Sequence, residues 1–167
     1  CFALQNGLNA PVIIVDDFIG SGHQFFTSWD RQYGSPPRSL REMAAVTSAP
    51  FYVCPAFCTE YALGQLRSAC PRLTVNPGHL IAKSYSALAD DSIVWPSHLR
   101  DTAVDFLRSA SSRAGIPDTE GSTPEDWRGF AKLGLTIALE GSVPDATLPL
   151  FYWERNGWHP LLRRTNA

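Results

Sequence analysis

The feature that most constrains the fold is a run of β-branched residues, Val12-Ile13-Ile14-Val15. An unbroken apolar run of this kind is typical of an interior strand that is buried on both faces of a parallel sheet. The acids Asp16-Asp17 stop the run, and a short loop, Gly20-Ser21-Gly22-His23, follows them. Aromatic residues between Phe25 and Tyr33 then recur at helical spacing, which predicts an amphipathic helix that Gly34 ends. This part of the sequence therefore predicts an interior strand, an acidic loop and a helix.

The rest of the chain continues the alternation of strands and helices. Pro55 is expected to end the second strand, and Thr123-Pro124-Glu125-Asp126 has the composition of a helix start. We expect further strands at 51–54, 73–75, 79–83, 133–139 and 148–153, and further helices at 40–45, 59–69 and 96–115. This alternation predicts an α/β fold with a mainly parallel sheet flanked by helices. The length, 167 residues, favours a single domain that spans residues 1–167.

Composition argues against several classes of function. The net charge of -2 gives no general attraction to nucleic acid, and the apolar runs are far shorter than a membrane span. A local basic cluster, His159 with Arg163-Arg164, leaves contact with a phosphate or a nucleic acid open. Cys54 and Cys58 do not have the spacing of the commonest zinc turn, so we expect reduced thiols. Together these features favour a cytoplasmic protein without a membrane partner.

Two acids directly before a Gly/Ser loop indicate a ligand with two different ends. Backbone N–H groups of the loop Gly20–His23, at a helix start, attract an anion, whereas Asp16 and Asp17 repel one. A ribose 5-phosphate suits both, because carboxylates accept hydrogen bonds from sugar hydroxyls while the loop holds the phosphate. Two alternatives stay open. One is a surface turn in which an aspartate caps the helix, and the other is a phosphohydrolase in which Asp16 is the nucleophile or a metal ligand.

The segment Val12–Gly22 resembles the phosphoribosyl-pyrophosphate motif of type I phosphoribosyltransferases: four apolar residues, two acids and a short Gly/Ser loop. More narrowly, Asp16–Gln24 resembles the phosphoribosyltransferase-like domains attached to bacterial conflict and phage-defence systems, retrons among them. Two C-terminal segments, Thr147–Trp153 and Trp158–Arg164, are similar to motifs of the same group. The resemblance therefore spans both ends of the chain.

The resemblance implies a type I phosphoribosyltransferase-like fold and a glycosyltransferase. Such an enzyme uses Mg²⁺ to break the C1–pyrophosphate bond of phosphoribosyl pyrophosphate, transfers ribosyl phosphate to an acceptor and here serves as a defence effector. By position, the catalytic residues are Asp16 and Asp17, which hold the ribose hydroxyls and help to place the metal. The 5-phosphate is expected to bind to the loop residues Phe18, Ile19, Gly20, Ser21, Gly22 and His23.

The same resemblance raises one conflict and two alternatives. In type I enzymes the pyrophosphate loop and the mobile catalytic loop precede the acidic motif, and only fifteen residues precede Asp16. We therefore expect the chain to be the C-terminal part of a longer protein and to lack the N-terminal part of the fold. The first alternative is a non-catalytic sensor of a nucleotide or ribose phosphate. The second is a protein-interaction domain of a defence complex, anchored by Trp153 and Trp158.

Overall fold

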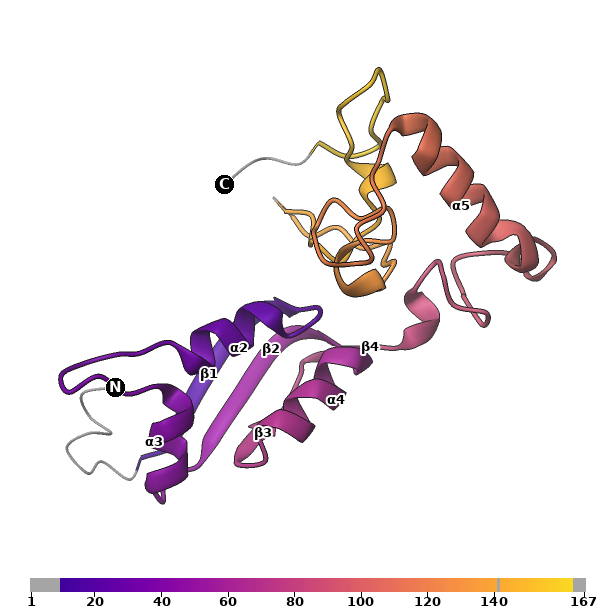
Figure 1. The fold of residues 1–167 in the computed structure, drawn as a ribbon. Coiled ribbons are helices and arrows are strands. Elements are labelled where there is room, and N and C mark those ends of the chain that lie inside the picture. The colour runs from indigo at the N-terminus through magenta and orange to yellow at the C-terminus, as the bar shows by residue number, and fades with distance from the viewer. Residues whose placement is uncertain (1–9, 141, 164–167) are drawn as a thin grey trace. The chain divides into compact units, whose positions relative to one another are not determined.

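The computed structural model describes residues 10–140 and 142–163, and the chain forms two compact units, residues 1–81 and 82–167 (Figure 1). The first unit contains a parallel sheet with the strand order β1-β2-β3, in which β4 also pairs with β2. Its strands are β1 (Val12–Ile19), β2 (Phe51–Thr59), β3 (Leu73–Val75) and β4 (His79–Ile81). The parallel sheet flanked by helices confirms the predicted α/β fold class.

The prediction that Val12–Val15 is an interior strand is wrong for the part of the chain that the structure describes. There β1 pairs only with β2 and forms an edge of the sheet. Ile13 and Val15 are 64% and 76% exposed, whereas Val12 and Ile14 pack against the core. An apolar run cannot by itself distinguish burial on one face from burial on two, because strand order depends on contacts that are distant in sequence.

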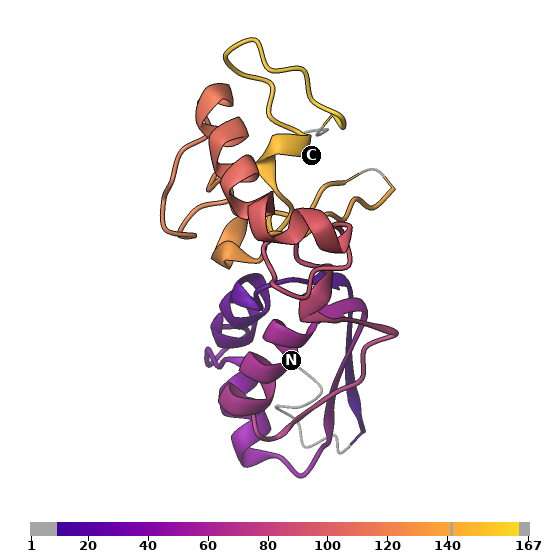
Figure 2. The same ribbon diagram turned by 90° about the vertical axis from the view of Figure 1, so that its right-hand side faces the viewer.

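Within residues 10–81, the three helices cover the same face of the sheet (Figure 2). Two successive crossovers that step in the same direction across a sheet place their helices on one face. The core under these helices joins Phe51 and Val53 of β2 to Trp29 and Leu66. The helices are α2 (His23–Asp30), α3 (Leu40–Val46) and α4 (Glu60–Ala69). The other face, which carries Ile13 and Val15, is the open face of the sheet.

Two sequence expectations about proline and glycine in this unit are wrong. Strand β2 continues through Pro55 to Thr59, and α2 ends at Asp30, before Gly34. The carbonyl oxygen of Pro55 accepts a hydrogen bond from Gly78 N at 2.8 Å, but proline has no N–H with which to continue the ladder. The neighbouring strand is accordingly interrupted between β3 and β4.

The second unit is built around α5 (Arg100–Ala114). Its core packs Leu107 of this helix against Trp127, Leu148 and Trp153. In the described part of this unit, four short 3₁₀ segments accompany it, at Lys83–Tyr85, Ser97–Leu99, Phe130–Lys132 and Pro149–Phe151.

The strands expected at 133–139 and 148–153 are not formed. Leu135 makes isolated bridges to Ser86 and Thr147 instead, and Pro149–Phe151 is a 3₁₀ turn. Of the helices in the described residues, none is both long enough and apolar enough to cross a bilayer.

Candidate functional site

The acid pair lies inside β1 rather than after it. Asp16 pairs with Pro55 and Phe18 with Phe57, so the register is the same on both sides of Asp17. Ile14 and Ile19 pack in the same core although they are five residues apart, and regular alternation would place them on opposite faces. The strand therefore turns over at the acids, and both aspartates are exposed there.

The two carboxyl groups are close enough to influence each other. Asp17 N donates to Asp16 Oδ1 at 3.0 Å, and Phe18 N donates to Asp17 Oδ1 at 2.8 Å. Although the Asp16 side chain is exposed, neighbouring groups shield its carboxyl from part of the solvent, and this desolvation raises its pKa. A hydrogen bond and charge repulsion from the Asp17 side chain raise the pKa of Asp16 further. A cation or a hydroxyl donor between the carboxyl groups would relieve this repulsion.

The loop after β1 leads directly into α2. Gly22 is the N-cap residue with φ 84°, and it offers no side-chain cap. Ser21 Oγ accepts a hydrogen bond from His23 N at 3.2 Å, so this hydroxyl occupies one of the N–H groups that the sequence analysis assigned to a phosphate. A Cβ atom on Gly22 would lie 3.2 Å from the Phe26 ring, in a backbone conformation that side chains rarely adopt.

Thr59 joins this loop to the next strand and helix. Its hydroxyl donates to the carbonyl oxygen of Gly20 and accepts from Ala62 N at 3.0 Å, which caps α4. The expected helix at 59–69 agrees with this position of α4, but the bond to Gly20 could not be predicted, because residues 39 positions apart leave no local pattern. The carboxyl ends of β1 and β2 are thereby held together, at the sheet edge where ligands of open α/β sheets bind.

The charges of the first unit are separated along its strands. The acid pair lies toward the carboxyl ends of the strands. All five arginines between residues 10 and 81 lie toward the other end of the sheet, where the strands begin. Arg31 follows the last residue of α2, Arg67 is in the last turn of α4, and Arg38 pairs with Tyr33. Arg41 contacts Asp30 and the Ala69 carbonyl, and Arg72 contacts the Thr47 carbonyl. Within residues 10–81, no lysine or arginine offsets the acid pair.

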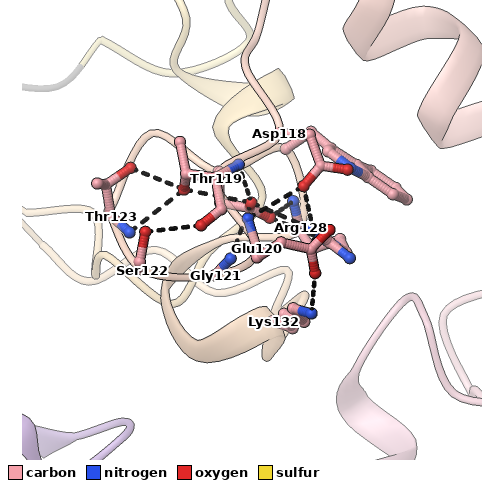
Figure 3. A network of polar contacts seen from close by, with 10 residues as sticks. Asp118, Thr119, Glu120, Gly121, Ser122, Thr123, Arg128 and Lys132 are labelled. Atoms are coloured by element: carbon pink, nitrogen blue, oxygen red, sulfur yellow. Dashed lines mark hydrogen bonds and ion pairs between the residues drawn. The ribbon is translucent and has the colours of Figure 1, made fainter.

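A second polar cluster lies in the second unit, and Figure 3 shows Thr119, Gly121 and Arg128 among its members. At its centre is the carboxylate of Asp126, which is buried. It accepts hydrogen bonds from Thr119 N at 2.7 Å, Gly121 N at 2.9 Å and Arg128 N at 3.0 Å, and from the Arg128 guanidinium. Burial by itself raises the pKa of Asp126, but these hydrogen bonds outweigh it and hold the pKa well below its usual range.

This cluster corrects another expectation, since Thr123–Asp126 does not start a helix. Asp126 instead gathers the preceding loop, and Glu120, Ala131 and Lys132 adopt positive φ. Arg128 also pairs with Asp118, and Lys132 with Glu120. These polar groups form hydrogen bonds and ion pairs with one another. We therefore interpret the cluster as one that stabilises this loop and not as a ligand site.

The remaining candidate residues do not gather into a site. Nowhere in residues 10–140 and 142–163 do three or more His, Cys, Asp or Glu side chains group to hold a metal ion. Cys58 is buried, which raises the pKa of its thiol to about 11, and Cys54 is partly buried. His159 and Arg163 lie in the C-terminal segment, and Arg164 lies outside the described residues.

The family model PRTase-CE matches residues 3–164, nearly the whole chain. The chain belongs to the PRTase-CE family. The predicted resemblance to phosphoribosyltransferase-like domains is thereby confirmed. No curated protein and no solved structure matches the chain significantly.

Membership of the PRTase-CE family gives the acid pair and its loop a context. The matched region covers nearly all of both units, so the motif around Asp16 and the segments around Trp153 and Trp158 fall within one family match. Trp153 is buried, and its indole N–H donates to the Ala114 carbonyl at 2.9 Å. The Trp158 indole N–H donates to the Leu150 carbonyl at 2.9 Å. These tryptophans pack within the second unit and do not extend the sheet.

Proposed function

We propose that this PRTase-CE domain binds phosphoribosyl pyrophosphate, or a related ribose 5-phosphate, at the carboxyl end of β1. The observation that carries the proposal is the exposed Asp16-Asp17 pair followed by the Gly20–His23 turn into α2. Carboxylates accept hydrogen bonds from the ribose hydroxyls, and the start of α2 favours the phosphate. Thr59 fixes the loop between them through Gly20.

The donor set at this edge suits Mg²⁺ that arrives with a phosphorylated ligand. Mg²⁺ is commonly bound by one or two carboxylates together with substrate phosphates, and it retains several waters. Asp16 and Asp17 supply two carboxylates, and within residues 10–81 no lysine or arginine lies beside them. A bound Mg²⁺ would neutralise charge on the pyrophosphate, and these two residues would hold it.

For the reaction we propose transfer of ribosyl phosphate to an acceptor, as a defence effector in the cytoplasm. Positive charge develops on the sugar as pyrophosphate leaves, and fixed carboxylates beside it lower the barrier. Asp16 and Asp17 are the catalytic residues of this proposal, because they lie on a strand that is held in register with β2.

A second candidate is a sensor that binds the ligand without turning it over, within a complex with a partner protein. The distribution of arginine favours it. Departure of pyrophosphate needs positive charge close by, and all five arginines of residues 10–81 lie toward the other end of the sheet. Ligand binding without release of pyrophosphate is the result that separates this candidate from the enzyme.

The test is calorimetric titration of the full chain with phosphoribosyl pyrophosphate, with and without Mg²⁺. Asp16→Asn and Asp17→Asn should each weaken Mg²⁺-dependent binding by about ten- to a hundred-fold, the value of a charge-assisted hydrogen bond. Asp91→Asn is the matched control, because it removes the same charge from an exposed residue of the second unit. Equal, metal-independent affinity in wild type and in the double Asn variant refutes the proposal.

A further inference from the structure

An aromatic row crosses the sheet one residue beyond the acid pair. The register aligns Phe18 of β1 with Phe57 of β2, and Phe57 with His79 of β4. The rings of Phe57 and His79 are in contact edge to face, with centroids 5.8 Å apart and planes at 68°. Three strands thus contribute an aromatic side chain at the same level.

The row points away from the helices. Ile19 and Cys58, the residues that follow Phe18 and Phe57, are 3% and 0% exposed in the core under α2 and α4. Neighbouring residues of a strand point to opposite faces, so Phe18 and Phe57 lie on the open face. Phe57 is 36% exposed, and His79 is exposed as well. The exposed part of the Phe57 ring forgoes the free energy that burial of an aromatic ring provides.

The row is within reach of a ligand that the acids hold. From strand rise and strand spacing, the backbone of Phe57 lies about 6 Å from that of Asp17. Ligand sites combine apolar and aromatic walls with a few placed polar groups, and this edge of the sheet presents both kinds of residue side by side.

We infer that Phe57 and His79 form the surface on which a nucleobase stacks, so that the ligand class includes a planar heteroaromatic ring. This inference rests on the proposed ribose-phosphate site. Aromatic side chains stack on every base through their π faces, and each base contributes about 1–3 kcal/mol, roughly five- to a hundred-fold in affinity. The acids and the loop hold the ribose phosphate, and the row selects ligands that carry a base.

The test compares ribose 5-phosphate with AMP, GMP, CMP and UMP by calorimetry in Mg²⁺ on the full chain. At least one nucleotide should bind about fivefold or more tightly than ribose 5-phosphate. Phe57→Ala and His79→Ala should remove this base-dependent gain and leave the affinity for ribose 5-phosphate unchanged. Phe57→Tyr should keep the gain. Ile13→Ala, an exposed apolar position elsewhere on the open face, is the control and should change neither affinity.

Three results separate failure of this inference from failure of the proposed site. Ribose 5-phosphate that binds in an Asp16-dependent way, with no nucleotide binding more tightly, overturns the aromatic surface alone. Equal loss of both affinities in Phe57→Ala, or an equal effect of Ile13→Ala, also overturns it, since the open face would then act as a general apolar or protein-binding surface. If no ribose phosphate binds to the wild type, the proposed function and this inference both fail.

Discussion

Replacing Asp126 by alanine tests whether the polar cluster of the second unit holds that unit together. The side chain is fully buried, and its carboxylate receives N–H groups from three backbone positions as well as the Arg128 guanidinium. Alanine removes every one of these acceptor sites at once. The loop residues Glu120 and Gly121, which adopt positive φ, then lose the group that orders them.

The magnitude follows from what the change leaves behind. The Arg128 side chain is 17% exposed, so its guanidinium keeps Asp118 as a partner but loses its buried one. Breaking one side of a buried ion pair costs about 3–5 kcal/mol, and an unpaired buried N–H costs about 1–3 kcal/mol. We expect Asp126→Ala to lower the free energy of unfolding by about 3–5 kcal/mol, because water reaches part of the opened loop. Asp126→Asn keeps one carbonyl acceptor and should lose about half as much.

The assay is urea unfolding followed by tryptophan fluorescence, at several pH values. The folded-state pKa of Asp126 lies below its unfolded value, so its contribution is full above about pH 4 and is lost as pH falls through the folded pKa. The difference between wild type and Asp126→Asn should therefore be constant from neutral pH to about pH 5 and shrink in stronger acid. Asp91→Asn, an exposed control, should show no such difference. If the free energy of unfolding of Asp126→Ala lies within about 0.5 kcal/mol of the wild-type value, the cluster does not stabilise the second unit.

Two further changes test the packing of the tryptophans and the cost of the acid pair. Trp153→Ala should lower the free energy of unfolding by about 3–5 kcal/mol, because it empties a buried site at the end of α5. Trp158→Phe should lower it by about 1 kcal/mol, because it removes one hydrogen bond. If urea unfolding shows only mild effects for both variants, a partner-binding role for these residues is favoured instead. Asp16→Asn should raise the melting temperature at pH 7 but not at pH 3. The pKa of Asp16 is raised in the folded state, so ionisation of Asp16 opposes folding; this effect is complete above the folded-state pKa and absent below the unfolded-state pKa. A melting temperature that falls at pH 7 would contradict this.

The parts of the fold that the sequence predicted are those with a local signal. The apolar run before Asp16 indicated a strand, and the helix expected at 59–69 corresponds to α4. The acid pair and its loop, which form the proposed site, were predicted in the same way, because these residues are consecutive in the sequence. The edge position of β1 left no such signal, since strand order follows from contacts between β1 and β2 that are distant in sequence.

The second unit shows where local patterns mislead. Thr123-Pro124-Glu125-Asp126 has the residues of a helix start, but the Asp126 carboxylate bonds backward to Thr119 and Gly121. A side chain that collects backbone N–H groups competes with helix formation and leaves no periodic pattern. At Pro55 the sequence predicted the end of a strand, but β2 continues through it. A strand can pass through proline where the neighbouring strand is already interrupted.

The backbone around the acid pair keeps Asp16 and Asp17 close together although their carboxyl groups repel each other. The Asp17 carboxyl and partial desolvation disfavour ionised Asp16, yet both acids lie on a strand whose register with β2 is the same on either side of them. Thr59 ties the following loop to α4, so the loop does not depend on ligand for its shape. Rigid elements that hold a site in advance reduce the ordering that binding must impose. A ligand that neutralises the acids therefore gains affinity from relief of their repulsion, and this is why Mg²⁺ dependence and the stability gain of Asp16→Asn are expected to share one physical origin.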